Sequence, residues 1–145
     1  MDAETGQFRL GNLHPEGDYL ANTRRIFEQF SLDFDKVHVL LGLSTDAALV
    51  DVTKDQSFSV VFIDGDHSYE VAKFDIETYT RLVSPGGFAV IDDAASFLPG
   101  RGYFKGMPSV SRACQILEQS PDWLNVLNVG HNRVFLRGGR DLPVP

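Results

Sequence analysis

The sequence predicts an α/β protein with a Rossmann-like, mostly parallel sheet. Two apolar runs, 58–63 and 88–91, flank a helical stretch from about Ser68 to Val83. Runs rich in β-branched and aromatic residues suit strands of a sheet that is covered on both faces. A strand, a helix and a second strand form a right-handed βαβ unit. Both strands of such a unit end at the same edge of the sheet, where open α/β sheets bind their ligands.

Acidic residues follow both strands at that edge. Asp64 comes directly after the first run, and Asp92 and Asp93 come after the second. Adjacent strands lie about 4.8 Å apart, so these side chains can converge on one point. Crowded carboxylates raise one another's pKa, and Mg²⁺, which prefers oxygen ligands, relieves their repulsion. We therefore predict a divalent metal site at Asp64, Asp92 and Asp93; the alternative is that these acids only serve turns and helix N-caps.

Three short motifs together resemble a known family. They are FIDGDHSYE at 62–70, Pro85-Gly86-Gly87 and Ile91-Asp92-Asp93. This pattern resembles the class I S-adenosylmethionine-dependent methyltransferases, and most closely the branch of metal-dependent O-methyltransferases that act on sugars and other small hydroxylated molecules. Catechol O-methyltransferase-like enzymes share the acidic spacing. The resemblance spans roughly 2–137, and it implies S-adenosylmethionine, Mg²⁺ or a similar cation, and a small-molecule hydroxyl acceptor such as a sugar.

The same resemblance suggests roles for the residues after Asp64. A metal ion bound by the acids lowers the pKa of a substrate hydroxyl. Asp66 is then the expected general base. His67 is the rival base, because imidazole titrates near neutral pH and some relatives place their base at that spacing. The structural alternative for Asp66 is an N-cap of the helix that follows.

A second group of residues is expected to bind the cofactor. The turn after the predicted strand at 37–41 resembles the family loop that precedes the adenine contacts, and Ser44 in it is equally readable as the N-cap of a helix at 45–51. Asp2 is placed where the family has the acid that holds the ribose hydroxyls, unless it is only a terminal acid. The expected cofactor residues are Asp2, Gly42, Ser44, Thr45 and Asp64.

The remaining segments complete the expected single domain, 1–145. Apolar residues at helical spacing predict helices at 18–30 and 109–119. Two apolar runs around a polar turn predict an antiparallel hairpin at 123–136. The Gly-rich and aromatic stretch 94–107 is expected to be a substrate lid, because it follows the strand that ends in acids.

Composition excludes several function classes. The chain has 145 residues, 43% of them hydrophobic, and a net charge of −7. This acidic balance argues against nucleic-acid partners, which need a basic face, and against anionic membranes. No apolar run has the roughly 20 residues of a membrane span. Cys114 is the single cysteine, so no internal disulfide can form, and we expect a cytoplasmic protein.

One expected part of the family pattern does not occur in the sequence. No Gly-x-Gly turn precedes the predicted strand at 37–41, whereas the family uses such a turn, after its first strand, for the methionine end of the cofactor. We therefore expect the first strands of the family fold to be missing and the neighbouring strand edges to be unpaired. Through these edges the chain should form homo-oligomers. Alone, it should bind S-adenosylmethionine only weakly. A non-catalytic binding or assembly module is the alternative, and a receiver-like phosphorylation domain is a further one.

Overall fold

The computed structural model describes residues 19–100 and 102–138. The chain divides into two compact units, 1–40 and 41–145. In the first unit, helix α1 (Tyr19–Gln29) precedes a short 3₁₀ helix, η2 (Phe34–Lys36). The ring of Phe34 meets Phe27 edge-on at 5.1 Å and lies 4.2 Å from the Arg24 guanidinium. These ring contacts join η2 to α1, and the helix expected at 18–30 is confirmed.

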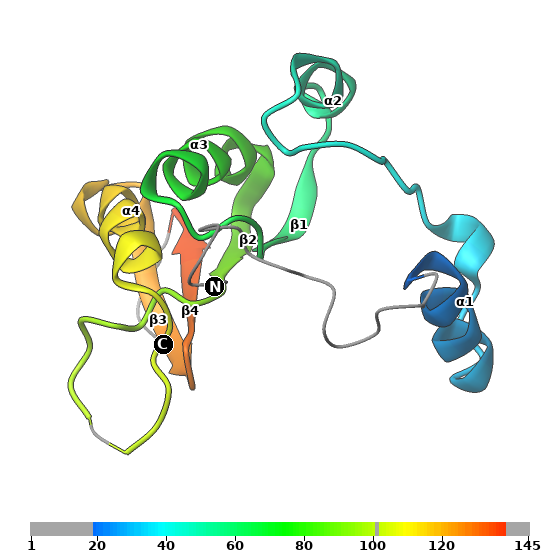
Figure 1. Ribbon diagram of the computed structural model, residues 1–145. Coiled ribbons are helices and arrows are strands. Elements are labelled where there is room, and N and C mark those ends of the chain that lie inside the picture. The colour runs from blue at the N-terminus through cyan, green and yellow to red at the C-terminus, as the bar shows by residue number, and fades with distance from the viewer. Residues whose placement is uncertain (1–18, 101, 139–145) are drawn as a thin grey trace, which may run out of the picture. The chain divides into compact units, whose positions relative to one another are not determined.

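The second unit contains a four-stranded sheet with its helices (Figure 1). The strands follow the order β1-β2-β4-β3; β1 is parallel to β2, and the other two pairings are antiparallel. This confirms the α/β class, with parallel pairing at the βαβ unit and an antiparallel C-terminal hairpin. The elements are α2 (Ala47–Thr53), β1 (Phe58–Ile63), α3 (Tyr69–Tyr79), η3 (Thr80–Leu82), β2 (Val83–Ile91), α4 (Pro108–Gln119), β3 (Trp123–Val129) and β4 (Asn132–Arg137).

Helices α3 and α4 cover one face of the sheet and enclose the core (Figure 1). Side chains from α3, β2 and β4 are fully buried there, among them Ile76, Ile91 and Phe135. Residues opposite each other in neighbouring strands share a face, as the pairs Ile63–Ile91 and Ala89–Phe135 do. The ends of β1 and β2 are therefore held firmly by packing on this side.

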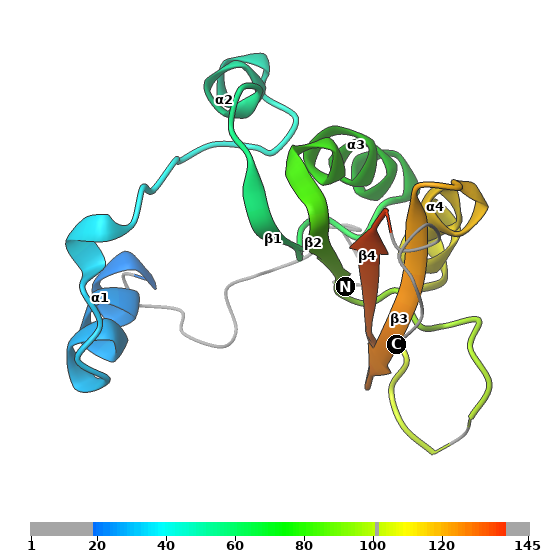
Figure 2. The same cartoon turned by 180° about the vertical axis from the view of Figure 1, so that it is seen from behind.

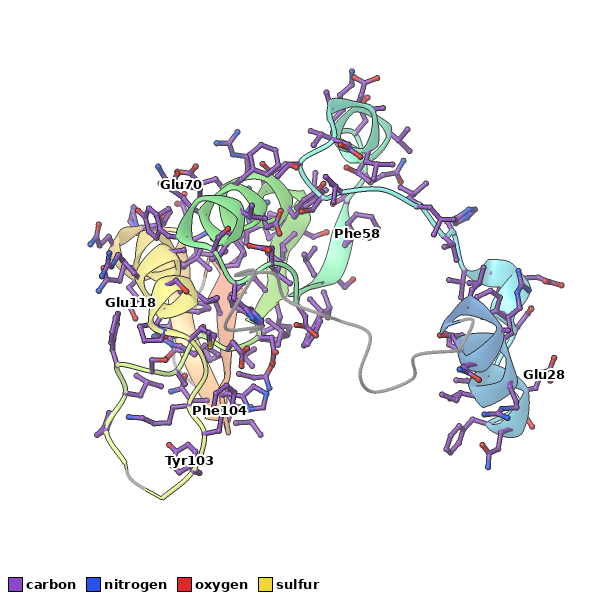
Figure 3. The ribbon with its side chains drawn as sticks, in the orientation of Figure 1. Glu28, Phe58, Glu70, Tyr103, Phe104 and Glu118 are labelled. Atoms are coloured by element: carbon purple, nitrogen blue, oxygen red, sulfur yellow. The ribbon has the colours of Figure 1, made fainter. Side chains whose placement is uncertain are left out.

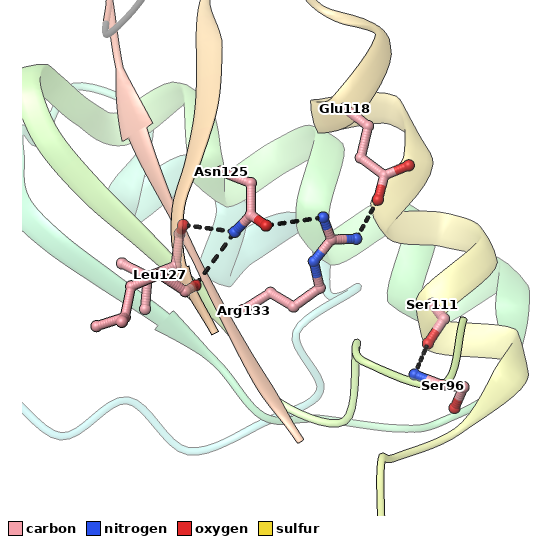
Figure 4. A network of polar contacts seen from close by, with 7 residues as sticks. Ser96, Ser111, Glu118, Asn125, Leu127 and Arg133 are labelled. Atoms are coloured by element: carbon pink, nitrogen blue, oxygen red, sulfur yellow. Dashed lines mark hydrogen bonds and ion pairs between the residues drawn. The ribbon is translucent and has the colours of Figure 1, made fainter. Parts of the chain in front are cut away.

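A buried arginine ties α4 to the hairpin (Figure 4). Arg133, which is 5% exposed, forms an ion pair with Glu118 of α4 and donates to Asn125 Oδ1 at 3.1 Å. Asn125 in turn donates to the carbonyl of Val134 at 2.9 Å. Because a buried cation needs partners, these bonds fix α4 against β3 and β4.

The opposite face of the sheet is not covered by any described residue of the second unit (Figure 2). Its side chains are apolar: Val60 is 55% exposed and Phe62 is 58% exposed. The face continues across the sheet through the pairs Val60–Phe88, Phe62–Val90, Phe88–Leu136, Val90–Val134, Leu124–Leu136 and Leu127–Val134. Within the described chain, β1 also has a strand neighbour on one side only. The expectation that the first strands of the family are missing stays a prediction.

Two local predictions were wrong. Residues 37–41 form no strand, and the reason is that no described strand pairs with them, so their backbone groups gain nothing from an extended ladder. Helix α2 begins at Ala47 with Asp46 as its N-cap, so Ser44 is not the cap. Asp46 Oδ2 instead accepts the Leu43 N–H at 2.9 Å and closes the turn before the helix.

Among the described helices, none has both the length and the apolar composition of a membrane span.

Candidate metal and cofactor site

Two acids meet where the parallel strands end. The Asp92 N–H donates to the Ile63 carbonyl at 2.9 Å, so the parallel pairing continues to the last residues of both strands. Burial raises the pKa of Asp64, and the neighbouring Asp92 carboxylate raises it further through charge repulsion and a side-chain hydrogen bond. This is the electrostatic signature of two carboxylates that share one site. The expected approach of Asp64 to Asp92 is therefore present.

Asp93 sits beside them in an unusual backbone conformation. It is 6% exposed and has a φ of 54°, in the left-handed region that a non-glycine residue seldom adopts. The Met107 N–H donates to the Asp93 carbonyl at 2.9 Å. A Cβ added to Gly106 would lie 2.2 Å from the same carbonyl oxygen. The close approach of the glycine backbone thus keeps Asp93 in this conformation, and backbone strain of this kind is concentrated at functional sites.

The two candidate bases have different partners. Asp66 Oδ1 accepts the Ser68 N–H at 2.7 Å, and the hydrogen bonds from Ser68 lower the Asp66 pKa. Helix α3 has Ser68 as its N-cap, so Asp66 closes the turn one step before the helix instead of capping it. His67 Nε2 lies 3.0 Å from Asp93 Oδ2, and Ser109 of α4 donates to the His67 carbonyl at 2.5 Å. His67 therefore contacts one of the acids directly.

His131, which lies in the polar turn of the C-terminal hairpin and was not predicted as a site residue, joins the cluster. Its Nε2 lies 3.2 Å from Asp92 Oδ1. The metal-binding atoms of Asp92, Asp93 and His131 all lie within 4.8 Å of one another. A usable signal was present, because a strand antiparallel to β2 must begin where β2 ends.

The turn at 42–45 is anchored to helix α3. The Tyr79 hydroxyl donates to the Ser44 carbonyl at 2.5 Å, and the Ser44 side chain bonds to Asp75. Gly42 has a φ of 156°, and a Cβ there would lie 2.8 Å from Leu49 Cδ1. Thr45 is exposed next to it. Asp2 lies outside the described residues, so its expected role stays a prediction.

A cleft runs from this turn along the open edge of β1 to Asp64. It has a volume of about 290 Å³. Ser44 and Asp64, two of the expected cofactor residues, both line it, together with the aromatic rings of Phe58 and Phe62. The structure thus places Ser44 and Asp64 at one cleft, whereas Gly42 and Thr45 are not part of its lining.

Asp75 is a further residue that sequence reasoning missed. It is 3% exposed and borders this cleft, and its Oδ1 has no hydrogen-bond partner among the described residues. Burial raises its pKa, while the Ser44 hydrogen bond lowers it. The signal in the sequence was an acid within the apolar stripe of α3, between Ala72 and Tyr79. An unpaired buried carboxylate oxygen beside a cleft is a place where a ligand donor can bind.

The loop after β2 carries two exposed aromatic rings, one of which lies near the acid cluster. Phe104 and Tyr103 extend from it and are 60% and 52% exposed (Figure 3). The Phe104 ring lies 5.4 Å from the His131 ring. The Ser96 N–H donates to Ser111 Oγ at 2.9 Å and fixes the start of the loop on α4 (Figure 4). The substrate lid expected at 94–107 stays a prediction.

Comparison with known proteins identifies the family and the fold. Residues 3–94 match the family model described as a methyltransferase domain. No curated protein sequence matches the chain. One similar structure is a protein from Corynebacterium glutamicum, with a TM-score of 0.60, 18% sequence identity, and coverage of 85% of this chain and 57% of that one. A second is the O-methyltransferase NovP, with a TM-score of 0.56, 20% identity, and coverage of 81% of this chain and 44% of that one. A third is an O-methyltransferase from Bacillus cereus in complex with SAH, with a TM-score of 0.55, 18% identity, and coverage of 83% of this chain and 60% of that one. The chain therefore shares their fold and spans about half of their length.

Proposed function

Because the chain belongs to the family of methyltransferase domains, we propose that it transfers a methyl group from S-adenosylmethionine to a hydroxyl oxygen of a small molecule. The observation that carries this proposal is the meeting of Asp64 with Asp92 at the edge of the sheet. Asp64 also lines the cleft that contains Ser44. One residue thus links the acid cluster to the expected cofactor loop, as a transfer reaction between two bound molecules requires.

The acid cluster fits a divalent cation. Carboxylate oxygens from Asp64, Asp92 and Asp93 are the ligand type that Mg²⁺ prefers. The raised pKa of Asp64 indicates repulsion from Asp92 that a cation would relieve. When bound, the ion would lower the pKa of the acceptor hydroxyl. These three residues would hold it, and His67 would orient Asp93 through its 3.0 Å contact.

We assign the proton transfer to Asp66. Its lowered pKa, which the hydrogen bonds from Ser68 cause, keeps the carboxylate ionised at neutral pH. His67 remains the rival, but its Nε2 already faces Asp93. A carboxylate is a sufficient base for a hydroxyl whose pKa has been lowered by a cation.

The cleft along β1 fits the adenosine part of the cofactor. Phe58 and Phe62 offer aromatic surface, and Ser44 and Asp75 offer polar groups on the other side. The unpartnered Asp75 Oδ1 is an acceptor for an amino or hydroxyl donor of the ligand. Gly42 and Thr45 belong to the same turn. Asp2 is proposed as the ribose ligand from the resemblance alone.

Methyl transfer in the presence and absence of metal tests the proposal. The purified chain is incubated with S-adenosylmethionine and either catechol or free monosaccharides, and release of S-adenosylhomocysteine is followed with Mg²⁺ or with EDTA. We expect slow release that needs the metal and is lost in Asp92→Asn. Release that persists in EDTA and in Asp92→Asn would contradict the metal-assisted mechanism. Asp66→Asn and His67→Gln, compared at saturating Mg²⁺, separate the two candidate bases.

A role as a binding or assembly module is the second candidate. The uncovered apolar face of the sheet, with Phe62 at 58% exposure, favours it. Titration calorimetry with S-adenosylmethionine distinguishes the two functions. Cofactor binding that weakens in Ser44→Pro or Asp75→Leu supports the enzyme, whereas an absence of binding together with a defined oligomer supports the module.

A further inference from the structure

The backbone places His131 at the acid cluster independently of its side chain. Strand β4 is antiparallel to β2, and Ile91 pairs with Arg133. The β3–β4 turn therefore lies directly beside Asp92 and Asp93. The Ala94 N–H donates to the His131 carbonyl at 3.0 Å and fixes the turn against the loop. The imidazole reaches the acids from the C-terminal hairpin, which is a different element from those that carry the predicted ligands.

The distances suit three ligands of one ion. Metal–ligand bonds of about 2.1 Å put neighbouring ligand atoms of an octahedral ion about 3 Å apart and opposite ones about 4.2 Å apart. His131 Nε2 and Asp92 Oδ1 are separated by 3.2 Å, as neighbouring ligands would be. All three ligand atoms of Asp92, Asp93 and His131 fall within 4.8 Å of one another, so a side-chain shift of about 0.6 Å at most brings them within the spacing of one octahedral ion. Asp92 is 15% exposed and His131 is 39% exposed at the side chain, so an ion can reach them.

We propose that His131 is a direct metal ligand and makes this site prefer a first-row transition ion, such as Co²⁺ or Mn²⁺, over Mg²⁺. The inference rests on the proposed metal-assisted function and names the ion class that the site takes. Imidazole nitrogen binds transition ions well, whereas Mg²⁺ favours oxygen ligands and retains several waters. Three acids alone would suit Mg²⁺; adding one nitrogen changes the preference.

Two other roles of His131 make different predictions. If its N–H only donates to Asp92, it orients that carboxylate, and its loss should weaken every divalent ion to the same extent. If it only packs on Phe104, 5.4 Å away, its loss should leave metal affinity unchanged. A nitrogen ligand alone changes the ratio of the affinities for the transition ion and for Mg²⁺.

Titration calorimetry with Co²⁺ and with Mg²⁺ measures this ratio. The wild-type chain is compared with His131→Gln, with His131→Asn as a second variant because Asn is well tolerated in turns. His38→Gln is the control, since His38 is an exposed histidine in the unit at 1–40. We expect tighter Co²⁺ than Mg²⁺ binding in wild type and His38→Gln. We expect the loss of His131 to weaken the binding of Co²⁺ at least about tenfold and the binding of Mg²⁺ by less than about threefold.

The visible absorption of bound Co²⁺ gives a second readout. At saturating Co²⁺ the spectrum should differ between wild type and His131→Gln, because one ligand has changed from nitrogen to oxygen. An equal loss of both ions, or unchanged affinities with an unchanged spectrum, would overturn the inference while the metal site stands. A different result would contradict the metal site itself, namely that Asp92→Asn binds Co²⁺ and Mg²⁺ with the same affinities as the wild type.

Discussion

The two faces of the sheet present the same kind of side chains in opposite environments. On the face covered by α3 and α4, Phe135 and Ile91 have no exposed surface. On the other face, Phe62 is 58% exposed and Val60 is 55% exposed. Along β2, for example, the buried Ala89 and Ile91 alternate with the more exposed Phe88 and Val90, as the pleat of a strand requires. The sequence pattern for a doubly covered sheet is therefore present, but the described residues of the second unit cover one side.

This difference explains which parts of the site are well defined. Asp64, Asp92 and Asp93 follow strands whose inner residues pack in the core, and hydrogen bonds such as that from Asp92 N–H to Ile63 hold them together. The cleft lies along β1, which is the end strand of the sheet among the described strands. The metal half of the proposed site thus depends on packed elements, and the cofactor half depends on a strand edge that has no strand neighbour among the described residues.

The largest expected effect tests the contrast between the faces with one residue type. Phe135→Ala removes a ring from the packed face and should lower the free energy of unfolding by about 3–5 kcal/mol. Phe62→Ala removes the same ring from the bare face and should change it by less than about 1 kcal/mol. Urea unfolding of both variants measures the difference. Equal losses would mean that the second face is also covered in solution.

The next effect separates crowding from backbone conformation near Asp93. Gly106 and Gly102 both have positive φ, 90° and 87°, but a Cβ would collide with Asp93 only at Gly106. Gly102→Ala should therefore lose about 1 kcal/mol, from the conformation alone. Gly106→Ala should lose at least about 2 kcal/mol more and should also weaken metal binding. Thermal unfolding and metal titration measure both, and similar losses in the two variants would show that the Asp93 contact is unimportant.

The sequence predicted the acid edge well because it depends on local rules. Strand ends, the βαβ unit and the positions of Asp64 and Asp92 follow from apolar runs and connection geometry. His131 was missed because its role depends on the pairing of β2 with β4, for example of Ile91 with Arg133, which are far apart in the sequence. The strand at 37–41 was wrong for a related reason, since β propensity cannot form a ladder without a partner. Asp75 could not be predicted from the sequence, because an acid beside the apolar stripe of an amphipathic helix is usually exposed to solvent.

A smaller effect concerns the buried acid at the boundary between the packed face and the open cleft. Burial raises the pKa of Asp75, so the folded state holds its proton at a pH where the unfolded chain, with a pKa near 3.9, has released it. Stability should therefore fall as pH rises from about 4 through the folded-state pKa. Asp75→Asn should be more stable than wild type at pH 7, by no more than about 1 kcal/mol. The stability difference between Asp75→Asn and the wild type should vanish below pH 4, and unfolding curves at both pH values measure it. A variant that is less stable than the wild type at pH 7 would mean that the ionised carboxylate has a partner.

The smallest expected effect on folding concerns self-association through the bare face. Val60→Thr replaces one exposed methyl group with a hydroxyl at nearly constant shape, so the free energy of unfolding should change by less than about 0.5 kcal/mol. If copies of the chain associate through this face, a symmetric contact contains the substitution twice, and about 0.8 kcal/mol per lost methyl group would weaken the dimer by roughly tenfold. Val52→Thr is the matched control, because Val52 is 58% exposed on α2 and lies outside the sheet. Light scattering over a concentration series should show a lower average mass for Val60→Thr and no change for Val52→Thr. The same mass for all three proteins would place any association at another surface.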